Sequence, residues 1–226
     1  SCIFMNSSIF KAYDIRGLFP EEINEKTAYQ IGRAFAVYLK EGEAPAPDKI
    51  VVGEDTRLSS PILARSFISG VTDEGINVWD IGAVAVDTVY FASGAHHLPA
   101  AMVTASHNPK EWNGFKLMKS DVDFFNVSDL EGILKNLPPK IPDIAKGEIS
   151  RENIKEQYIK HVLSFIHIEN IRPMRIAIDA GNGAVGPILK SVLLKLPIEY
   201  VIKKSIDDMQ DEIRAGHYHF GCSFDA

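Results

Sequence analysis

Short β-prone apolar runs alternate with stretches that carry one apolar helical face, and this alternation constrains the fold most strongly. Residues 49–53 and 76–81 are two such runs. Between them, Ser60 followed by Pro61 predicts a helix with Ser60 as its N-cap and Pro61 as its first residue. Strands that alternate with helices at this spacing form mainly parallel, helix-covered sheets. The alternation returns from Arg175 onward. The sequence therefore predicts an α/β protein with two consecutive α/β domains, each a mainly parallel mixed sheet covered by helices.

The composition excludes several classes of function. The formal net charge of −6 argues against a nucleic-acid-binding surface, which requires a basic face. No apolar run approaches the length needed to cross a membrane. The two cysteines, Cys2 and Cys222, lack a CxxC spacing, which is typical of a protein in a reducing compartment. We therefore expect a cytoplasmic protein that binds neither nucleic acid nor membrane.

A proline-rich segment of mixed charge, residues 137–148, separates the two α/β series. We interpret it as a connector between domains, because such segments rarely form regular elements. The predicted domains are residues 1–150 and residues 151–226. The second series stops directly after an expected strand, where an α/β domain places a functional loop. We therefore expect the second domain to be truncated.

Residues 100–118 concentrate the polar groups best suited to chemistry. An apolar run ends at Thr104, a polar turn carries Ser106, His107 and Asn108, and a short returning run contains Lys116. Because ligands bind at the carboxyl ends of strands in such sheets, this turn is a candidate site. Spacing alone leaves open a second interpretation, in which Ser106 or Asn108 only caps a helix.

Three further motifs have alternative interpretations. The Gly-Asn-Gly loop at residues 181–183 precedes a helix and suggests a nucleotide-binding protein, although it lacks the full dinucleotide fingerprint. His217 and His219 alternate on an expected final strand, where histidines more often have a structural role than bind a metal. Arg57 follows a strand two residues after Asp55, and we expect a structural ion pair between them.

Four segments occur in order along the chain: FKAYDIRG at residues 10–17, VGEDTR at 52–57, TASHNP at 104–109 followed by NGFK at 113–116, and DAGNG at 179–183. Any one of them is a weak signal, but four in order across most of the chain are specific. Together they resemble the α-D-phosphohexomutase family in its phosphomannomutase/phosphoglucomutase branch.

The resemblance implies an enzyme that interconverts hexose 1-phosphate and hexose 6-phosphate, with mannose or glucose as the sugar. In such an enzyme Ser106 carries a phosphoryl group and passes it to a hexose monophosphate, which gives a bisphosphate intermediate. Lys116 is then the general acid and base toward the sugar hydroxyl. Phosphoryl transfer of this kind depends on positioning and on charge neutralisation.

The same resemblance assigns the phosphate-binding side chains. Arg16 and His107 are expected to stabilise the phosphoryl oxygens. Tyr13 is expected to shape the pocket, and Asn108 to orient the loop. The implied ligands are the hexose phosphates themselves.

The resemblance also implies Mg²⁺, bound in the family by an Asp-Gly-Asp-x-Asp-Arg loop together with the serine phosphate. Oxygen ligands of this kind suit Mg²⁺. Here Ser106 and Asp225 are the expected metal ligands, but Ala226 stands where glycine is usual and the other ligands are absent. We also expect the family's third and fourth domains to lie outside this sequence. The alternative hypothesis is therefore a catalytically incomplete fragment or phosphate-binding module, inactive by itself.

Overall fold

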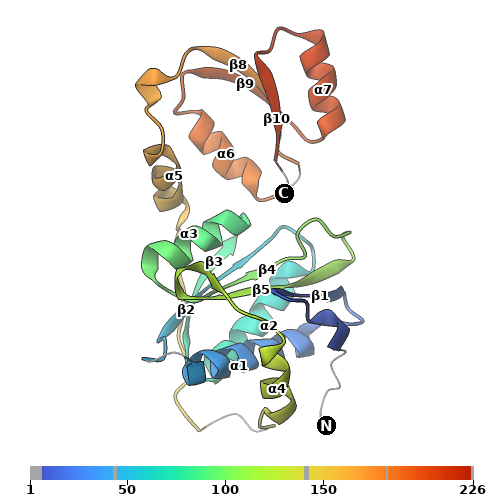
Figure 1. Cartoon of the computed structure of the whole chain (residues 1–226), viewed down its shortest axis with the longest axis vertical. Coiled ribbons are helices and arrows are strands. Elements are labelled where there is room, and N and C mark those ends of the chain that lie inside the picture. The colour runs from blue at the N-terminus through green and yellow to red at the C-terminus, as the bar shows by residue number, and fades with distance from the viewer. Residues whose placement is uncertain (1–6, 43–44, 140–142, 182, 225–226) are drawn as a thin grey trace. The chain divides into compact units, whose positions relative to one another are not determined.

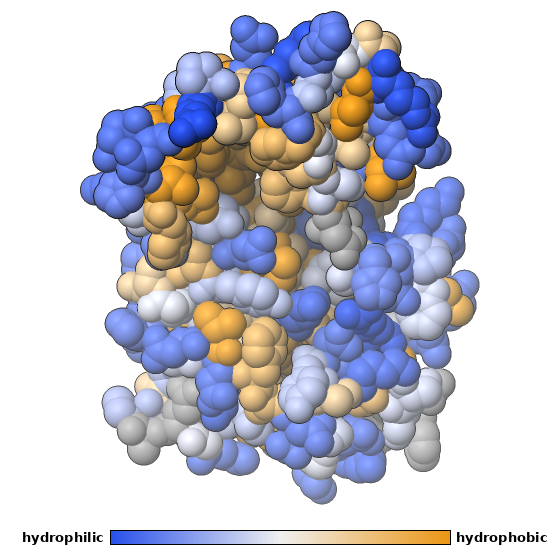
Figure 2. Space-filling view, turned by 45° about the horizontal axis from the view of Figure 1, so that its top comes forward, coloured by the Kyte–Doolittle hydropathy of each residue, from blue (hydrophilic) through white to orange (hydrophobic). Residues whose placement is uncertain are grey.

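The computed structural model describes residues 7–42, 45–139, 143–181 and 183–224. The chain divides into two compact units, Ser1–Asn153 and Ile154–Ala226, which are described separately. Hydrophilic side chains cover much of the face drawn in Figure 2, with apolar side chains between them. Across the described ranges, no helix combines the length and the apolar character required to pass through a membrane.

A seven-stranded mixed sheet forms the centre of the first unit (Figure 1). Its strands are β1 (Asp14–Leu18), β2 (Lys49–Glu54), β3 (Asn77–Ala83), β4 (Ala100–Val103), β5 (Trp112–Lys119), β6 (Asp123–Phe124) and β7 (Ile149–Arg151). They lie in the order β1-β5-β4-β2-β3-β7, and β6 pairs with β5. Every strand of this sheet other than β5 runs in the same direction. The predicted mainly parallel mixed sheet is therefore confirmed.

Helices cover both faces of this sheet (Figure 1). They are α1 (Glu25–Gly42), α2 (Ser60–Asp73), α3 (Val86–His96) and α4 (Asp129–Asn136), with short 3-10 turns η1 (Ser7–Ile9) and η2 (Ser120–Val122). In Figure 1, α1, α2 and α4 lie on one face and α3 on the other. The fully buried rings of Phe35, Phe67 and Phe115 form the centre of the core on the α1–α2 face, and Phe67 stacks on Phe115 with ring centroids 5.2 Å apart.

The starts of α1 and α2 differ in how their amides are satisfied. At α1, Asn24 Oδ1 accepts hydrogen bonds from the amides of Lys26 and Thr27, as expected of an N-cap. At α2 the cap position is Ser59, and no side chain caps the helix. The prediction that Ser60 is the cap is therefore wrong by one residue, because the Ser60 hydroxyl donates to Asp55 instead.

The described residues of the proline-rich segment belong to the first unit. Within it, the amide of Gly147 donates to the carbonyl of Thr72 at 2.9 Å, and directly after it β7 pairs with the edge strand β3. Lys146 forms an ion pair with the buried Asp73, with Nζ 2.5 Å from Oδ1. The interpretation of residues 137–148 as a connector between domains is wrong. The end of this segment contacts α2, and the strand that follows it pairs with the edge of β3.

The second unit is a smaller parallel sheet with three helices. Its described elements are α5 (Lys155–Ser164), η3 (Ile168–Asn170), β8 (Met174–Asp179), α6 (Val185–Leu193), β9 (Ile198–Lys203), α7 (Ile206–Ala215) and β10 (Phe220–Ser223). The strand order is β10-β8-β9, and both pairs are parallel. The core contains Ile176, Ile178 and Leu193. His217 and His219 precede β10 instead of lying on it, and His219 Nδ1 accepts a hydrogen bond from the backbone amide of Arg175.

Candidate active site

The candidate site lies where β2 and β4 end side by side. These two strands are adjacent and parallel, and the amide of Asp55 donates to the carbonyl of Val103 at 3.0 Å. Residues 55–59, here called the arginine loop, and residues 104–111, here called the serine loop, therefore begin at the same edge of the sheet. The prediction that both loops lie at carboxyl ends of strands is confirmed.

Ser106 lies in a tight turn of the serine loop. Its backbone has a φ of 54°, in the left-handed region that few residues other than glycine adopt. Its amide donates to Thr104 Oγ1 at 2.8 Å, and the amide of Asn108 donates to the carbonyl of Ala105 at 3.1 Å. The loop leads into β5, not into a helix, so the alternative in which Ser106 or Asn108 caps a helix is wrong.

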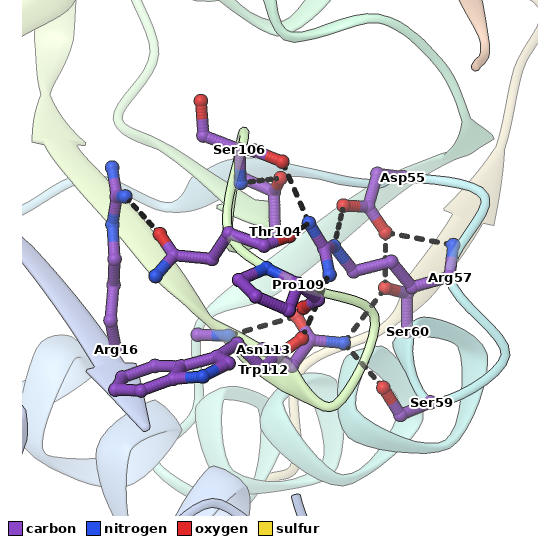
Figure 3. Close-up of polar contacts among 12 residues, drawn as sticks. Arg16, Asp55, Arg57, Ser59, Ser60, Thr104, Ser106, Pro109, Trp112 and Asn113 are labelled. Carbon is purple, nitrogen blue, oxygen red and sulfur yellow. Dashed lines mark hydrogen bonds and ion pairs between the residues drawn. The ribbon is translucent and has the colours of Figure 1, made fainter. Parts of the chain in front are cut away.

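Arg57 joins the two loops (Figure 3). Its Nε donates to Asp55 Oδ2 at 3.1 Å, which confirms the expected ion pair. Its two terminal nitrogens donate to backbone carbonyls, at 2.7 Å from Nη2 to Ser106 and to Asn108, at 2.7 Å from Nη1 to Pro109, and at 3.1 Å from Nη1 to Trp112. No local sequence signal indicated which carbonyls this guanidinium would reach.

Asn113 ties the start of α2 to the same site. Its side chain is fully buried, and Nδ2 donates to Ser59 Oγ at 2.7 Å and to Ser60 Oγ at 3.0 Å. The Ser60 hydroxyl in turn donates to Asp55 Oδ1. A continuous set of hydrogen bonds therefore links β5, the start of α2 and the arginine loop (Figure 3). No local sequence signal indicated this role of Asn113, although its position directly before Gly114 is part of the family motif.

Arg16 reaches the serine loop from β1. This strand pairs with β5, and Arg16 is opposite Gly114. Arg16 Nη1 donates to Asn108 Oδ1 at 2.6 Å, while Nε and Nη2 contact Asp14 Oδ2 at 2.8 and 2.7 Å. The structure therefore brings Arg16 and Asn108 together on the loop that carries Ser106.

Lys116 lies on β5, opposite Asp14 on β1 and Met102 on β4. Its neighbours Phe115 and Leu117 are fully buried in the core on the α1–α2 face, so Lys116 points to the other face of the sheet. The Lys116 side chain is partly buried, and its terminal nitrogen has no hydrogen bond or ion pair with any residue that the structure describes. This leaves the ammonium available to a ligand.

Two predicted site residues, His107 and Tyr13, have exposed side chains at the site. His107 is exposed on the serine loop, and Tyr13 is 64% exposed directly before β1. Within the described ranges neither side chain makes a hydrogen bond or an ion pair. Their positions next to Ser106 and Asp14 agree with the sequence, but their roles stay predictions.

Two groups close to the site have shifted pKa values. Burial raises the pKa of the Glu54 carboxyl at the end of β2, and the carboxylate of Asp80 raises it further. Burial likewise raises the pKa of Tyr90 on α3, with smaller contributions from Asp87 and Asp14. Asp14, one of these carboxylates, also forms an ion pair with Arg16 and so offsets part of its positive charge.

The expected metal ligands are only partly covered by the structure. Asp225 lies outside the described residues. The described residues contain no group of three or more His, Cys, Asp or Glu side chains that could hold a metal ion. Ser106 therefore lacks a set of described partners for Mg²⁺.

The serine loop follows the end of strand β4, Arg57 fixes its backbone, and its Asn108 side chain is hydrogen-bonded to Arg16. A serine held in this way is suited to phosphoryl transfer in an α/β protein. Residues 7–138 match the family model "Phosphoglucomutase/phosphomannomutase, alpha/beta/alpha domain I". The chain belongs to the phosphoglucomutase/phosphomannomutase family.

Individual proteins extend this similarity beyond the first unit. The chain is 35% identical over 208 residues to a phosphomannomutase of Salmonella montevideo, covering 87% of this chain and 44% of that protein. It is 38% identical over 207 residues to the phosphohexose mutases of Xanthomonas campestris pv. campestris strain B100, again with 87% and 44% coverage. A phosphoglucomutase/phosphomannomutase family protein of Burkholderia thailandensis has a similar crystal structure, with a TM-score of 0.83, 27% identity, and coverage of 96% of this chain and 52% of that one. The chain thus spans about half the length of these relatives.

Proposed function

We propose that this chain acts in a phosphohexomutase reaction, the interconversion of the 1-phosphate and the 6-phosphate of mannose or glucose. The observation that carries the proposal is the serine loop, whose backbone is held by Arg57 and whose Asn108 side chain is joined to Arg16. A hydroxyl on such a fixed loop suits phosphoryl transfer, because that reaction depends on positioning and charge neutralisation. The names of the relatives, phosphomannomutase and phosphohexose mutases, support hexose phosphates as substrates.

In the proposed reaction, Ser106 Oγ carries a phosphoryl group. A hydroxyl oxygen of the bound hexose monophosphate attacks the phosphorus, the bond from phosphorus to Ser106 Oγ breaks, and a hexose bisphosphate forms. Lys116, as the neutral amine, takes the proton of the attacking hydroxyl, and the ammonium so formed returns a proton to the released Ser106 oxygen. The bisphosphate then reorients and returns its other phosphoryl group to Ser106 by the reverse steps.

The remaining side chains are proposed to hold the phosphoryl oxygens. Arg16 uses Nε and part of each terminal nitrogen for Asp14 and Asn108, which leaves N–H groups on both terminal nitrogens. His107, exposed beside Ser106, supplies a further donor, and Tyr13 lines the entrance.

Intact-mass measurement tests the role of the serine. The purified chain is incubated with glucose 1,6-bisphosphate and is expected to gain the mass of one phosphoryl group. Ser106→Ala should gain none, whereas Ser69→Ala, which removes an exposed hydroxyl on α2, should behave like the wild type. An equal gain of mass in the Ser106→Ala variant would refute the proposal.

A second candidate function is a phosphate-binding module that is catalytically incomplete by itself. The observation that favours it is the coverage of only 44% of the relatives' length. We expect the purified chain to take up a phosphoryl group and bind hexose phosphate without sustained conversion of hexose 1-phosphate. Sustained turnover by the 226-residue chain would exclude this candidate.

We also propose Mg²⁺ as the cofactor, with Ser106 and Asp225 as the ligands that this chain contributes. A bound Mg²⁺ would neutralise charge on the phosphoryl oxygens, and it prefers oxygen ligands. Calorimetric titration of Mg²⁺ into the phosphorylated chain and into its Asp225→Asn variant tests this. Equal affinity in the two proteins would contradict the assignment of Asp225.

A cytoplasmic location is part of the same proposal. Cys222, the cysteine within the described residues, is a free thiol, and burial raises its pKa. A reducing cytoplasm keeps such thiols free. Cell fractionation with an antibody to this chain provides the test, and recovery outside the cytoplasmic fraction would contradict the proposal.

A further inference from the structure

The Arg57 guanidinium has no donor left for a ligand. An arginine side chain has five N–H groups in a fixed fork. Arg57 donates once from Nε to Asp55, twice from Nη1, and twice from Nη2, so every N–H group has an acceptor inside the protein. Its side chain is also largely buried, at 14% exposure.

Arg16 provides the contrast within the same site. Its described contacts involve Asp14 and Asn108 only, and they leave donors on both terminal nitrogens. Two arginines therefore lie at the serine loop, but only one of them has capacity to bind a phosphate. Proximity to Ser106 would suggest the same role for both.

We propose that Arg57 is a positioning residue, which fixes the conformation of Ser106 through the loop carbonyls and does not itself bind phosphate. The proposal deepens the function proposed above for Ser106 and rests on it for its catalytic consequence. Its structural part stands on the contacts of Arg57 alone.

The geometry of Ser106 explains why such a residue is needed. A left-handed serine is strained and persists only when its surroundings hold it. Arg57 Nη2 binds the carbonyl of Ser106 itself, and Figure 3 shows the hydroxyl directed away from the guanidinium. Holding the carbonyl on one side thus presents the hydroxyl on the other.

The test compares Arg57→Lys with the matched control Arg65→Lys, which makes the same change at an exposed position of α2. A lysine has three N–H donors on a single nitrogen, so it cannot donate to all the acceptors that surround the planar guanidinium of Arg57. The charge is kept in both variants, and only the fork is lost.

Hydrogen exchange of the backbone amides gives the structural readout. In Arg57→Lys we expect exchange in residues 104–112 to accelerate about tenfold or more, because several charge-assisted hydrogen bonds are lost. Exchange in β3 should be unchanged, and Arg65→Lys should match the wild type in both segments. Unchanged exchange in the loop, or equal acceleration in the loop and β3, would overturn the proposal.

Phosphoryl uptake from glucose 1,6-bisphosphate gives the functional readout. For Arg57→Lys we expect the maximal rate to fall at least about tenfold with an unchanged half-saturating concentration, since misplacing a reacting group slows the chemical step. A raised half-saturating concentration with an unchanged maximal rate would identify Arg57 as a phosphate ligand and overturn the proposal. If the wild type takes up no phosphoryl group, the proposed function fails, and hydrogen exchange still decides the role of Arg57.

Discussion

Replacing Gly32 by alanine should destabilise the first unit, although the same replacement stabilises an isolated helix. Gly32 lies inside α1, where this helix crosses α2. A Cβ atom at Gly32 would lie 2.2 Å from the carbonyl oxygen of Phe67. The crossing is equally close from the other side, since a Cβ at Gly70 would lie 2.1 Å from the carbonyl oxygen of Tyr29. The two glycines therefore allow the helix backbones to touch.

The magnitude follows from two opposing effects. Alanine is favoured over glycine in a helix interior by about 1 kcal/mol. Restoring an ordinary contact at Gly32 requires the two backbones to separate by about 1 Å, and overpacking of a core costs about 1–3 kcal/mol. Because the contact is with backbone and cannot be relieved by a rotamer change, we take the upper end. The net effect is a loss of about 2 kcal/mol.

Gly132→Ala is the matched control. Gly132 lies inside α4, and a Cβ there would meet no atom within 4 Å, so only the propensity effect remains. This variant should be stabilised by about 0.5–1 kcal/mol. The two predictions therefore differ in sign for the same chemical change.

Tryptophan fluorescence during thermal unfolding is the assay. The two tryptophans, Trp79 and Trp112, both lie in the first unit and report on it selectively. A loss of about 2 kcal/mol corresponds to a fall in Tm of roughly 4–8 °C for a unit of this size. If Gly32→Ala raised the Tm as Gly132→Ala is expected to, the close approach of α1 and α2 would not exist.

Three further predictions concern buried polar groups. Burial raises the pKa of Asp73, but hydrogen bonds from Lys146 and Tyr29 outweigh burial and hold that pKa below 3.8. The contribution of Asp73 to stability is therefore present above pH 3.8 and is lost as the pH falls through the lowered pKa. Asp73→Asn should flatten this acid dependence of the unfolding free energy, measured by urea titration. Burial and the hydrogen bond to Asp73 raise the pKa of Tyr29 from 10.0 to about 12, so the unfolding free energy should fall as the pH rises between these values. If Tyr29→Phe showed the same fall with pH as the wild type, Tyr29 would not be its cause. Asn113→Ala should lower the unfolding free energy by about 1–3 kcal/mol, because the buried hydroxyls of Ser59 and Ser60 lose the N–H donor of Asn113. A change below about 0.5 kcal/mol in chemical denaturation would show that these hydrogen bonds contribute little.

The longer elements of the fold could be predicted from local sequence patterns. The apolar stripe of α1 and the cap at Asn24 are encoded by residues within a few positions of one another. The short elements were not predicted. β7 has three residues and pairs only with the edge of β3, and the residues of β6 and α4 likewise gave no prediction. Segments of this length take their structure from the neighbour that they contact.

The sequence by itself determined the inventory of the candidate site: the order of polar groups around Ser106, the strand that carries Lys116, and the family to which they point. The tertiary structure decided what the charged groups do. Arg57 contacts carbonyls 49 to 55 residues away, and Asn113 contacts serines 53 and 54 residues away. Such contacts depend on β2 and β4 being neighbours in the sheet, and the order of strands follows from packing of the whole unit, which no local pattern of residues specifies.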